Sequence, residues 1–360
     1  MYDFLIVGAG FAGSVLAERI ASQLNKKVLI IDKRDHIGGN AYDEQDENGI
    51  LIHKYGPHIF HTNSKTVFDY LSQFTEWIFY EHKVLASFKG NLYPIPINRL
   101  TLNKLYKLNL QTEKEVQEFY EKVKEKRYPV INSEDIIVNQ VGIDLFEKFF
   151  RYYTKKQWNL EPKDLSPSVC GRIPVRTNTD CRYFTDKYQF MPKEGYTKMF
   201  KRMLSHKNIE LILNKDYKEI LNEVKFNRMI YTGPIDYFFD YIHGKLPYRS
   251  IRFEYNLIDS RKYQDAAVIN YVDNSYNFTR VTEYKYFYEF ESDKTTISKE
   301  FYQKEGEPYY PVLNKINLDI FKQYKKLSES IENVHFAGRL AEYRYYNMDQ
   351  VVASIITRKI

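Results

Sequence analysis

The residues with the clearest chemical meaning are the glycines of Gly8–Gly13, a G-x-G-x-x-G motif that directly follows an apolar run. In a strand–turn–helix unit, the first glycine allows a tight turn and the second lets backbone N–H groups approach a diphosphate. The third lets the helix pack against the strand. Asp32 follows about 20 positions later, after a second apolar run, where its carboxylate can accept both hydroxyls of a ribose. The pattern predicts a dinucleotide site and favours FAD or NAD over a 2′-phosphorylated cofactor.

The distribution of glycine supports the same interpretation. Seven of the 15 glycines lie within the first 56 residues, where even spacing would place about two. Gly38 and Gly39 belong to the loop 32–40, which follows the second apolar run. A cofactor ribose or diphosphate is the simplest reason for such a glycine-rich loop.

Arginines and aromatic residues further along the chain indicate a second, anionic ligand. Arg172, Arg176 and Arg182 share one short segment, and Arg280 lies inside a strand-like stretch. Guanidinium groups grip diphosphates with paired hydrogen bonds, so a nucleotide-sugar or similar anion would suit them. Alternatively, these arginines pair with carboxylates or face solvent, and the sequence leaves both open. Clusters of tyrosine, and Trp158, could form walls for a sugar or a base.

Metal sites and side-chain nucleophiles have less support. His58 and His61 lie close together in sequence, but no third ligand is evident nearby, so we expect no metal. A histidine packed against a cofactor ring or within the core is the simpler interpretation. The sequence holds no G-x-S-x-G or H-E-x-x-H motif, so a bound cofactor must supply the difficult chemistry.

Composition argues against several other classes of protein. The 53 basic and 47 acidic residues give a net charge of +6 that is spread along the chain, without the basic block that a nucleic-acid track needs. The two cysteines lack metal-ligand spacing and fit a reducing cytosol. No apolar run approaches the roughly 18 residues of a membrane span, and we recognise no signal peptide. A soluble, cytoplasmic protein without membrane insertion is therefore expected.

The elements that must position these residues begin with a βαβ unit. Residues 2–7 and 27–32 read as buried parallel strands, with a helix over about 13–24 between them. Residues 222–236 contain another apolar strand. Residues 334–339 form one more that meets a glycine, before a C-terminal helix from about Asp349. The nucleotide domain is therefore expected to be assembled from separated segments.

Between those segments, the periodicity changes twice. Residues 100–165 are helical in pattern, whereas 249–256, 266–272, 278–284 and 286–291 are rich in β-branched and aromatic residues and read as antiparallel strands. The fold class is α/β: a doubly wound FAD-binding domain with an inserted helical domain and an antiparallel β-sheet domain. The expected boundaries are 1–80, 196–240 and 330–360 for the first, 98–165 for the second, and 81–97, 166–195 and 241–329 for the third.

Several motifs taken together resemble those of the bacterial UDP-galactopyranose mutase family. They run from the N-terminus to the C-terminus and are jointly specific: Gly8–Gly13, His36–Tyr42, His53–Thr62, Tyr153–Trp158, Arg172–Arg176, Tyr231–Asp236, Glu307–Val312 and Phe336–Tyr343. The resemblance implies a homodimer that binds FAD, which must be reduced for activity. It also implies a redox-neutral isomerisation of UDP-galactopyranose to UDP-galactofuranose, for cell-surface polysaccharide precursors. In that family, flavin N5 attacks the anomeric carbon, UDP leaves, the flavin–sugar adduct opens, and the sugar recloses as a furanose.

Site residues carry over from the resemblance position by position. The catalytic set is Arg176, Arg280 and His61, with the arginines on the diphosphate and the histidine near the flavin ring. The substrate set is His82, Tyr153, Thr154, Trp158, Tyr188, Arg249, Asn270, Tyr310 and Tyr345. The cofactor set is Gly8, Gly10, Phe11, Ala12, Gly13, Asp32, Lys33, Gly39, Asn40, His58, Ile59, Gly338, Arg339, Met348, Asp349, Gln350, Val351 and Val352.

Two positions depart from the family pattern. Asn347 stands where an aspartate is expected, and His82 stands where an asparagine is expected near the substrate. The second departure touches sugar specificity, so UDP-N-acetylgalactosamine stays open as a substrate. Two other classes also stay open: a flavin oxidoreductase of the amine-oxidase type, and a non-catalytic nucleotide-binding protein.

Overall fold

The computed structural model describes residues 1–288 and 290–358 and divides the chain into two compact units. Unit 1 comprises 1–80, 186–248 and the segment from 307 onward, and unit 2 comprises 81–185 and 249–306. Both units are assembled from segments that are far apart in the sequence. Each is described separately below.

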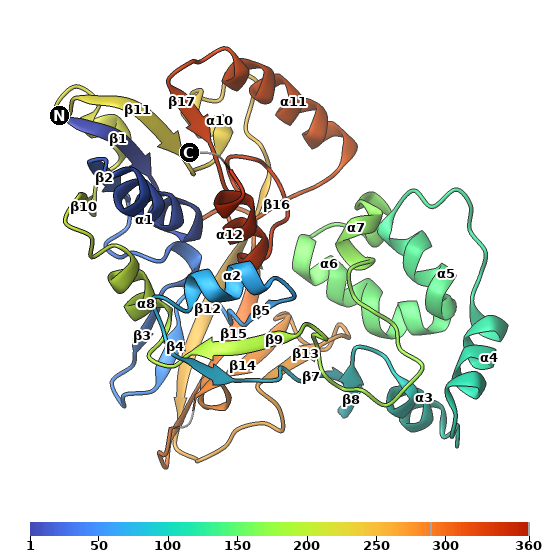
Figure 1. Cartoon of the computed structure of the whole chain (residues 1–360). Coiled ribbons are helices and arrows are strands. Elements are labelled where there is room, and N and C mark those ends of the chain that lie inside the picture. Colours follow the sequence, from blue (N-terminus) through green and yellow to red (C-terminus); the bar gives the residue numbers. More distant parts are fainter. Residues whose placement is uncertain (289, 359–360) are drawn as a thin grey trace. The chain divides into compact units, whose positions relative to one another are not determined.

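Unit 1 is built on a parallel sheet in the order β10-β2-β1-β11-β17. Its strands are β1 (Tyr2–Val7), β2 (Val28–Ile31), β10 (Ile209–Ile212), β11 (Phe226–Tyr231) and β17 (Val334–Phe336). They come from both ends and the middle of the chain, as their colours show (Figure 1). All four residues of β2 are buried, which explains the continuous apolar run there. Helix α1 (Phe11–Leu24) follows β1.

Smaller elements surround this sheet in unit 1. An antiparallel sheet runs in the order β5-β9-β6, and β3 pairs with β4. The strands are β3 (Asp43–Gln45), β4 (Leu51–His53), β5 (Phe60–Thr62), β6 (Trp77–Phe79), β9 (Tyr188–Pro192) and β16 (Tyr310–Pro311). The helices are η1 (Gly39–Ala41), α2 (Lys65–Leu71), α8 (Tyr196–Met203), α9 (Tyr217–Ile220), α10 (Ile235–Phe238), α11 (Lys315–Glu329) and α12 (Met348–Ile356).

Unit 2 combines a sheet with a group of helices. The sheet runs β12-β15-β14-β13-β7-β8 and is antiparallel except where β13 pairs with β7. Its strands are β7 (Val84–Phe88), β8 (Asn91–Ile95), β12 (Tyr248–Ile258), β13 (Val268–Tyr271), β14 (Arg280–Glu283) and β15 (Thr295–Gln303). Residue 248, at the start of β12, belongs to unit 1.

The helices of unit 2 begin at capping residues that the sequence supplies. The side chains of Asn98, Thr112 and Asn132 accept backbone N–H groups at the starts of α3, α4 and α5. The helices are α3 (Arg99–Tyr106), α4 (Glu113–Val123), α5 (Ser133–Phe146), η2 (Glu147–Arg151), α6 (Tyr152–Trp158), η3 (Pro162–Asp164), α7 (Pro167–Cys170) and, after β14, η4 (Tyr284–Phe287). Gly142 interrupts α5 with a φ of 80°, and a Cβ there would lie 2.1 Å from the carbonyl oxygen of Val123. A glycine is required at that break.

The predicted fold class is confirmed, and one predicted strand is wrong. The strand expected over 286–291 does not form among its described residues, and residue 289 lies outside them. Tyr284–Phe287 instead make a 3₁₀ turn in which Tyr284 and Phe287 are both buried. Residues three apart fall on one side of such a turn but on opposite faces of a strand, so burying both rings favours the turn. The next strand, β15, was not predicted. The division into three domains stays a prediction.

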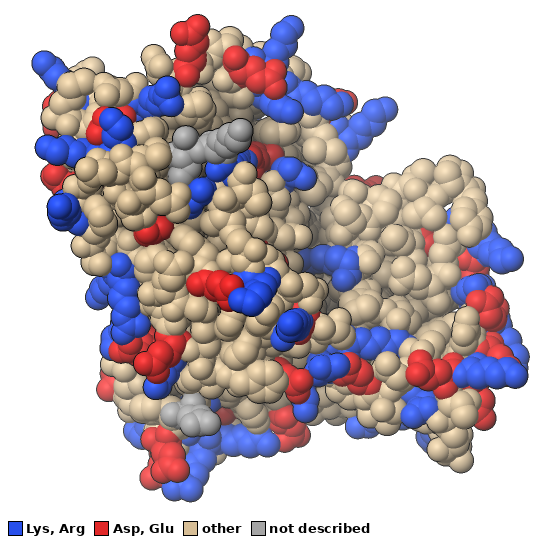
Figure 2. Space-filling model, in the orientation of Figure 1, with Lys and Arg blue, Asp and Glu red and all other residues tan. Residues whose placement is uncertain are grey.

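The surface carries no run of one charge on the face that Figure 2 draws, where basic and acidic side chains are interspersed. Within the described residues, no helix has the length and apolar character needed to cross a bilayer.

Candidate functional site

The glycine-rich turn of unit 1 is packed too tightly for side chains at two of its positions. Gly8 has a φ of +102°, and a Cβ there would lie 2.1 Å from Thr232 Oγ1. A Cβ on Gly13 would lie 1.8 Å from the carbonyl oxygen of Gly8. Thr232 Oγ1 also donates to the carbonyl oxygen of Val7 at 2.7 Å, which ties the end of β11 to the end of β1. The first and third glycines therefore allow the turn and the close approach of α1.

The second glycine, Gly10, has a different environment. A Cβ there would lie 3.6 Å from Gly39 Cα, an ordinary contact. Gly39 and Gly338, with φ of +56° and +89°, bring two further backbone segments to the start of α1. Within the described chain, no side chain caps α1 and no acidic residue lies in its first turn. This backbone cradle at a helix N-terminus, with its positive dipole end, suits a diphosphate.

Asp32 lies at the end of β2 and contacts the glycine turn directly. Its Oδ2 accepts the N–H of Ala9 at 2.8 Å, and its Oδ1 accepts the N–H of Arg34 at 2.9 Å. The side chains of Lys33 and Arg34 reach Glu307 at 2.9 and 3.1 Å. Burial acts to raise the pKa of the Glu307 carboxyl, but the charges of Lys33 and Arg34 outweigh it and hold this pKa below its usual range.

Sequence reasoning missed Arg34 and Glu307 as members of the cofactor region. Arg34 also donates to Asn40 Oδ1 at 3.0 Å and lies over the ring of Tyr55, with Cζ 4.4 Å from the ring centroid. The available signal was the position of Arg34, two residues after Asp32 and inside the glycine-rich loop. Nothing in the sequence pairs the loop with Glu307.

Two histidines lie at the end of β4 and shortly after it: His53 is buried, and His58 is half-buried. His58 donates its backbone N–H to His53 Nδ1 at 3.0 Å, and His58 Nδ1 lies 2.8 Å from the carbonyl oxygen of Gly56. Burial lowers the pKa of His58 to about 4, with a further contribution from the positive charge of Arg339. His53 has its pKa lowered well below the usual value by burial. Both imidazoles are therefore neutral near pH 7.

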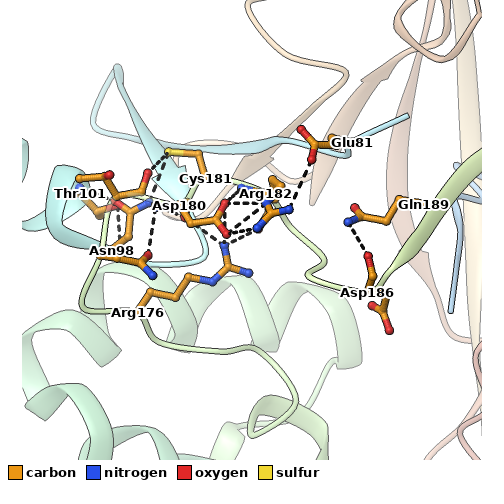
Figure 3. A network of polar contacts seen from close by, with 11 residues as sticks. Glu81, Asn98, Thr101, Arg176, Asp180, Cys181, Arg182, Asp186 and Gln189 are labelled. Carbon is orange, nitrogen blue, oxygen red and sulfur yellow. Dashed lines mark hydrogen bonds and ion pairs between the residues drawn. The ribbon is translucent and has the colours of Figure 1, made fainter. Parts of the chain in front are cut away.

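His61 is held in one orientation by a carboxylate of the same unit. Its Nδ1 lies 3.0 Å from Asp186 Oδ2, so in the neutral ring Nδ1 carries the proton and Nε2 is an acceptor. Asp186 also accepts the Asn63 amide at 2.8 Å, and its backbone carbonyl accepts Gln189 Nε2 (Figure 3). Within the part of the chain that the structure describes, no group of three or more histidines, cysteines or carboxylates could hold a metal ion.

Helix α12 carries the last predicted cofactor residues, Met348–Val352, and explains one departure from the family pattern. Asn347 is the N-cap of this helix, and its N–H donates to Gln350 Oε1 at 2.9 Å. Asparagine and aspartate are about equally good N-caps, so the substitution keeps the helix start. Asp349 accepts Thr62 Oγ1 at 3.0 Å and so ties α12 to β5.

Three predicted substrate residues lie in unit 1 and form aromatic contacts there. The rings of Tyr310 and Tyr345 stack at 4.9 Å, and Arg339 Cζ lies 4.7 Å from the Tyr310 ring centroid. Tyr188 lies in β9, where its ring stacks on Phe68 at 4.5 Å. None of these three tyrosines is among the residues that line the pocket found in unit 2.

Unit 2 contains a pocket that unites four of the predicted substrate residues. Tyr153, Thr154 and Trp158 from α6 line it together with Asn270 from β13. Asn270 is 7% exposed, and its Oδ1 has no hydrogen-bond partner among the described residues. A buried acceptor in this state costs free energy unless a ligand completes it. Gln157, Arg172 and Tyr183 also line the pocket, and the spacing of 153, 154, 157 and 158 on one helix face could have indicated Gln157.

Two predicted arginines adjoin this pocket. Arg280 Nη2 donates to the Tyr153 hydroxyl at 3.1 Å, and its Nε lies 3.3 Å from the buried Glu300 carboxylate. Arg249 is 5% exposed, and its Cζ lies 5.7 Å from the Trp158 ring centroid. Arg280 is only partly buried, and guanidinium groups placed beside aromatic rings in this way can hold an anion. For Arg280, carboxylate pairing and ligand binding are thus compatible.

Arg176 and His82 stand differently from the pocket. Arg176 Nη1 donates to the carbonyl oxygens of Asp180 and Arg182, so its guanidinium is held by its own loop (Figure 3). Burial lowers the pKa of Arg176. His82 is buried and stacks on Phe184 at 6.0 Å. His82 does not line the pocket. Its carbonyl oxygen does accept the N–H of Tyr183, which is a pocket-lining residue.

The fold and the two sets of residues define a Rossmann-like nucleotide-binding protein with a ligand pocket in a second unit. The Rossmann-like NAD(P)-binding domain family matches residues 6–74, and the UDP-galactopyranose mutase family matches 148–345. This chain belongs to the UDP-galactopyranose mutase family. The resemblance inferred from the motifs is confirmed.

Several curated relatives match almost the whole chain. A probable UDP-galactopyranose mutase from Klebsiella pneumoniae is 38% identical, with 98% of this chain and 93% of the relative covered. A dTDP-fucopyranose mutase from Escherichia coli is 39% identical, with 99% and 97% covered. A crystal structure of reduced UDP-galactopyranose mutase has a TM-score of 0.79 at 16% identity, covering 99% of this chain and 94% of that one.

Proposed function

We propose that this chain is a reduced-FAD-dependent mutase that converts UDP-galactopyranose to UDP-galactofuranose, for cell-surface polysaccharide precursors. The observation that carries the proposal is the similarity, over almost the whole chain, to proteins named as pyranose mutases of nucleoside diphosphate sugars. The pocket of unit 2 supports it, because its aromatic rings, the adjoining Arg249 and Arg280 and the incomplete Asn270 acceptor suit a nucleotide with a diphosphate.

FAD fits the residues of unit 1. The cradle of Gly10, Gly39 and Gly338 beside the uncapped start of α1 can take the diphosphate, and Asp32 with Lys33 can take the ribose region. The neutral, half-buried His58 and the α12 residues 348–352 would complete the site. When bound, the reduced flavin supplies a nucleophilic ring nitrogen and ends the cycle in its starting redox state, which suits an isomerisation.

The chain's own residues would act on charge and orientation. Breaking the bond between the sugar and the diphosphate leaves negative charge on UDP, and Arg280 can stabilise that charge while Tyr153 and Glu300 fix its guanidinium. Trp158 and Thr154 would position the nucleotide, which matters because the reaction needs near-contact alignment of the reacting atoms. Asp186 fixes the tautomer of His61, so its Nε2 can accept a hydrogen bond from a ligand.

Other predicted roles rest on the resemblance. Arg176 would stabilise the departing diphosphate after leaving its loop carbonyls, and Tyr310 and Tyr345 would donate to phosphates. The homodimer, the cytoplasmic location and the three-domain division are proposals of the same kind.

A second substrate has a specific observation in its favour. The relative named as a dTDP-fucopyranose mutase is 39% identical to this chain, about as similar as the probable UDP-galactopyranose mutase. The thymine base adds a methyl group to the pyrimidine, and fucose lacks the 6-hydroxyl of galactose. Overall similarity therefore does not separate these two substrates, and the amine-oxidase alternative has only a shared fold, since a putrescine oxidase structure matches with a TM-score of 0.57 at 13% identity.

Turnover of matched substrates tests the proposal. Reduced enzyme would be incubated separately with UDP-galactopyranose, UDP-N-acetylgalactosamine and dTDP-fucopyranose under anaerobic conditions, and the products would be separated by chromatography. The proposal expects the highest kcat/KM for UDP-galactopyranose. A preference for dTDP-fucopyranose would reassign the substrate, and no furanose product from any of the three would overturn the mutase assignment.

A further inference from the structure

The Lys156 ammonium occupies an unusual position in unit 2. It is inside α6, yet its Nζ donates to four backbone carbonyl oxygens, one at the end of β13 and three in the loop that joins β13 to β14. The acceptors are Tyr271 at 2.6 Å, Asp273 at 2.7 Å, Tyr276 at 3.2 Å and Phe278 at 3.2 Å. An ammonium has three N–H donors, so at least one bond is shared. One side chain thus contacts the backbone at four positions between residues 271 and 278.

Opposing effects act on the charge of Lys156. Burial lowers its pKa to about 8, and the carboxylate of Asp273 acts in the opposite direction. The four carbonyl dipoles also favour the charged form. Asp273 itself accepts the N–H groups of Lys89 at 2.8 Å and Ser275 at 3.0 Å, so its carboxylate shapes the loop. The neighbouring Lys155 is paired with Glu161 at 2.6 Å.

The loop held by Lys156 has ligand-site residues at both ends. Asn270, in β13, precedes the loop and lines the pocket, and Arg280 opens β14 after it. The two residues are register partners across the strand pair. The helix that carries Lys156 also lines this pocket, through Tyr153 and Trp158. Lys156 therefore links α6 to the β13–β14 pair, and both α6 and β13 contribute residues to one pocket.

We propose that Lys156 is a positioning residue, whose ammonium fixes the β13–β14 loop so that Asn270 and Arg280 are set for a nucleoside diphosphate. This inference rests on the proposed function. Without the ammonium, four carbonyls would lose their donor, and the ends of the loop could shift relative to α6. Hydrogen bonds from a charged donor contribute more than neutral ones, so replacing Lys156 by an apolar residue should weaken UDP binding by roughly tenfold or more.

The loop has a second source of cohesion, so the variant should still fold. The rings of Tyr271, Tyr276 and Phe278 contact one another with centroids 4.7 to 5.1 Å apart. Methionine retains the volume of the lysine stem, and Lys156→Arg retains the charge. Lys155→Met is the matched control, because it removes a neighbouring exposed ammonium from the same helix.

Two measurements on the holoenzyme test the proposal together. Calorimetric titration gives the UDP Kd of wild type, Lys156→Met, Lys156→Arg and Lys155→Met between pH 7 and 10, a range that spans the Lys156 pKa of about 8. Hydrogen exchange then reports the opening of residues 271–278. We expect Lys156→Met to weaken UDP binding and speed exchange in this segment, while the other two variants stay close to wild type near pH 7. In wild type and in Lys155→Met, which both keep Lys156, affinity should fall further with deprotonation above about pH 8. Any change in affinity that comes from titration of UDP itself should also occur in Lys156→Arg, but the additional fall should not, because arginine stays protonated over this range.

The outcomes separate this inference from the proposed function. Faster exchange with unchanged UDP affinity would make Lys156 merely structural, and unchanged exchange would show that it does not anchor the loop. Either result overturns the proposal. A wild-type protein that binds neither UDP nor dTDP would instead refute the proposed function and, with it, the ligand half of the inference, while exchange still decides the anchoring half.

Discussion

We expect Gly13 to be needed for folding and Gly10 for cofactor binding. Replacing each by alanine separates these two effects. A Cβ on Gly13 would lie 1.8 Å from the carbonyl oxygen of Gly8, so backbone must move by more than an ångström. Overpacking of this kind costs about 1–3 kcal/mol or more. A Cβ on Gly10 would meet Gly39 Cα at 3.6 Å, and the φ of −83° suits alanine. Gly10→Ala should therefore change the free energy of unfolding of the apoprotein by only about 0.5 kcal/mol.

For FAD affinity, we expect the larger loss in Gly10→Ala. If the N–H groups beside Gly10 hold the diphosphate, the added methyl blocks its approach, and FAD affinity should fall by roughly tenfold or more. Urea unfolding of the apoprotein measures the first effect, and quenching of flavin fluorescence during FAD titration measures the second. Wild-type FAD affinity in Gly10→Ala, or wild-type apoprotein stability in Gly13→Ala, would refute the reasoning.

Three further predictions follow from single side chains. Arg280→Lys cannot reproduce the contacts to Tyr153 and Glu300 together, so calorimetry should show UDP affinity reduced by about tenfold with circular dichroism unchanged; equal affinity would contradict the assigned role. The carboxylate of Asp43 accepts the N–H groups of Tyr196 and Thr197 at the start of α8, so Asp43→Asn should lower the free energy of unfolding by about 1–3 kcal/mol in urea titrations, and a neutral result would count against it. Because burial lowers the pKa of His58 to about 4 from 6.5, the unfolded chain binds the proton first, and stability should fall by up to about 3 kcal/mol as the pH drops from 6.5 to 4; His58→Gln should flatten this slope, and an unchanged slope would exclude His58 as its cause.

The βαβ unit that contains β1 and β2 was predictable because its physical causes are local. The glycine turn, the buried apolar runs of β1 and β2 and the acidic residue after β2 act within about thirty residues. The strand order β10-β2-β1-β11-β17 could not be predicted, because β10 and β17 are short and join the sheet through contacts with strands that are distant in the sequence. The wrong strand over 286–291 has a similar origin, since the burial of Tyr284 and Phe287 on one side decided the turn.

The type of ligand could be predicted from the sequence, but the hydrogen-bond and ion-pair partners of the site residues could not. Arginine and aromatic content indicated an anionic ligand, and α6 and β13 do bring Tyr153, Thr154, Trp158 and Asn270 to one pocket. The pairing of Arg280 with Glu300, and the capture of the Arg176 guanidinium by its own loop, depend on tertiary packing. The role of Lys156 could not be seen, because its acceptors are backbone atoms more than a hundred residues away.

The central claim is a redox-neutral isomerisation that nevertheless needs a reduced flavin. Purified protein would be incubated anaerobically with UDP-galactopyranose, with the flavin either oxidised or reduced by dithionite, while its absorbance is recorded and the UDP-sugars are separated. The account predicts a UDP-galactofuranose peak with the reduced protein alone, together with a flavin spectrum that stays reduced throughout turnover. Equal product from the oxidised protein, or product formed with stoichiometric oxidation of the flavin, would contradict it.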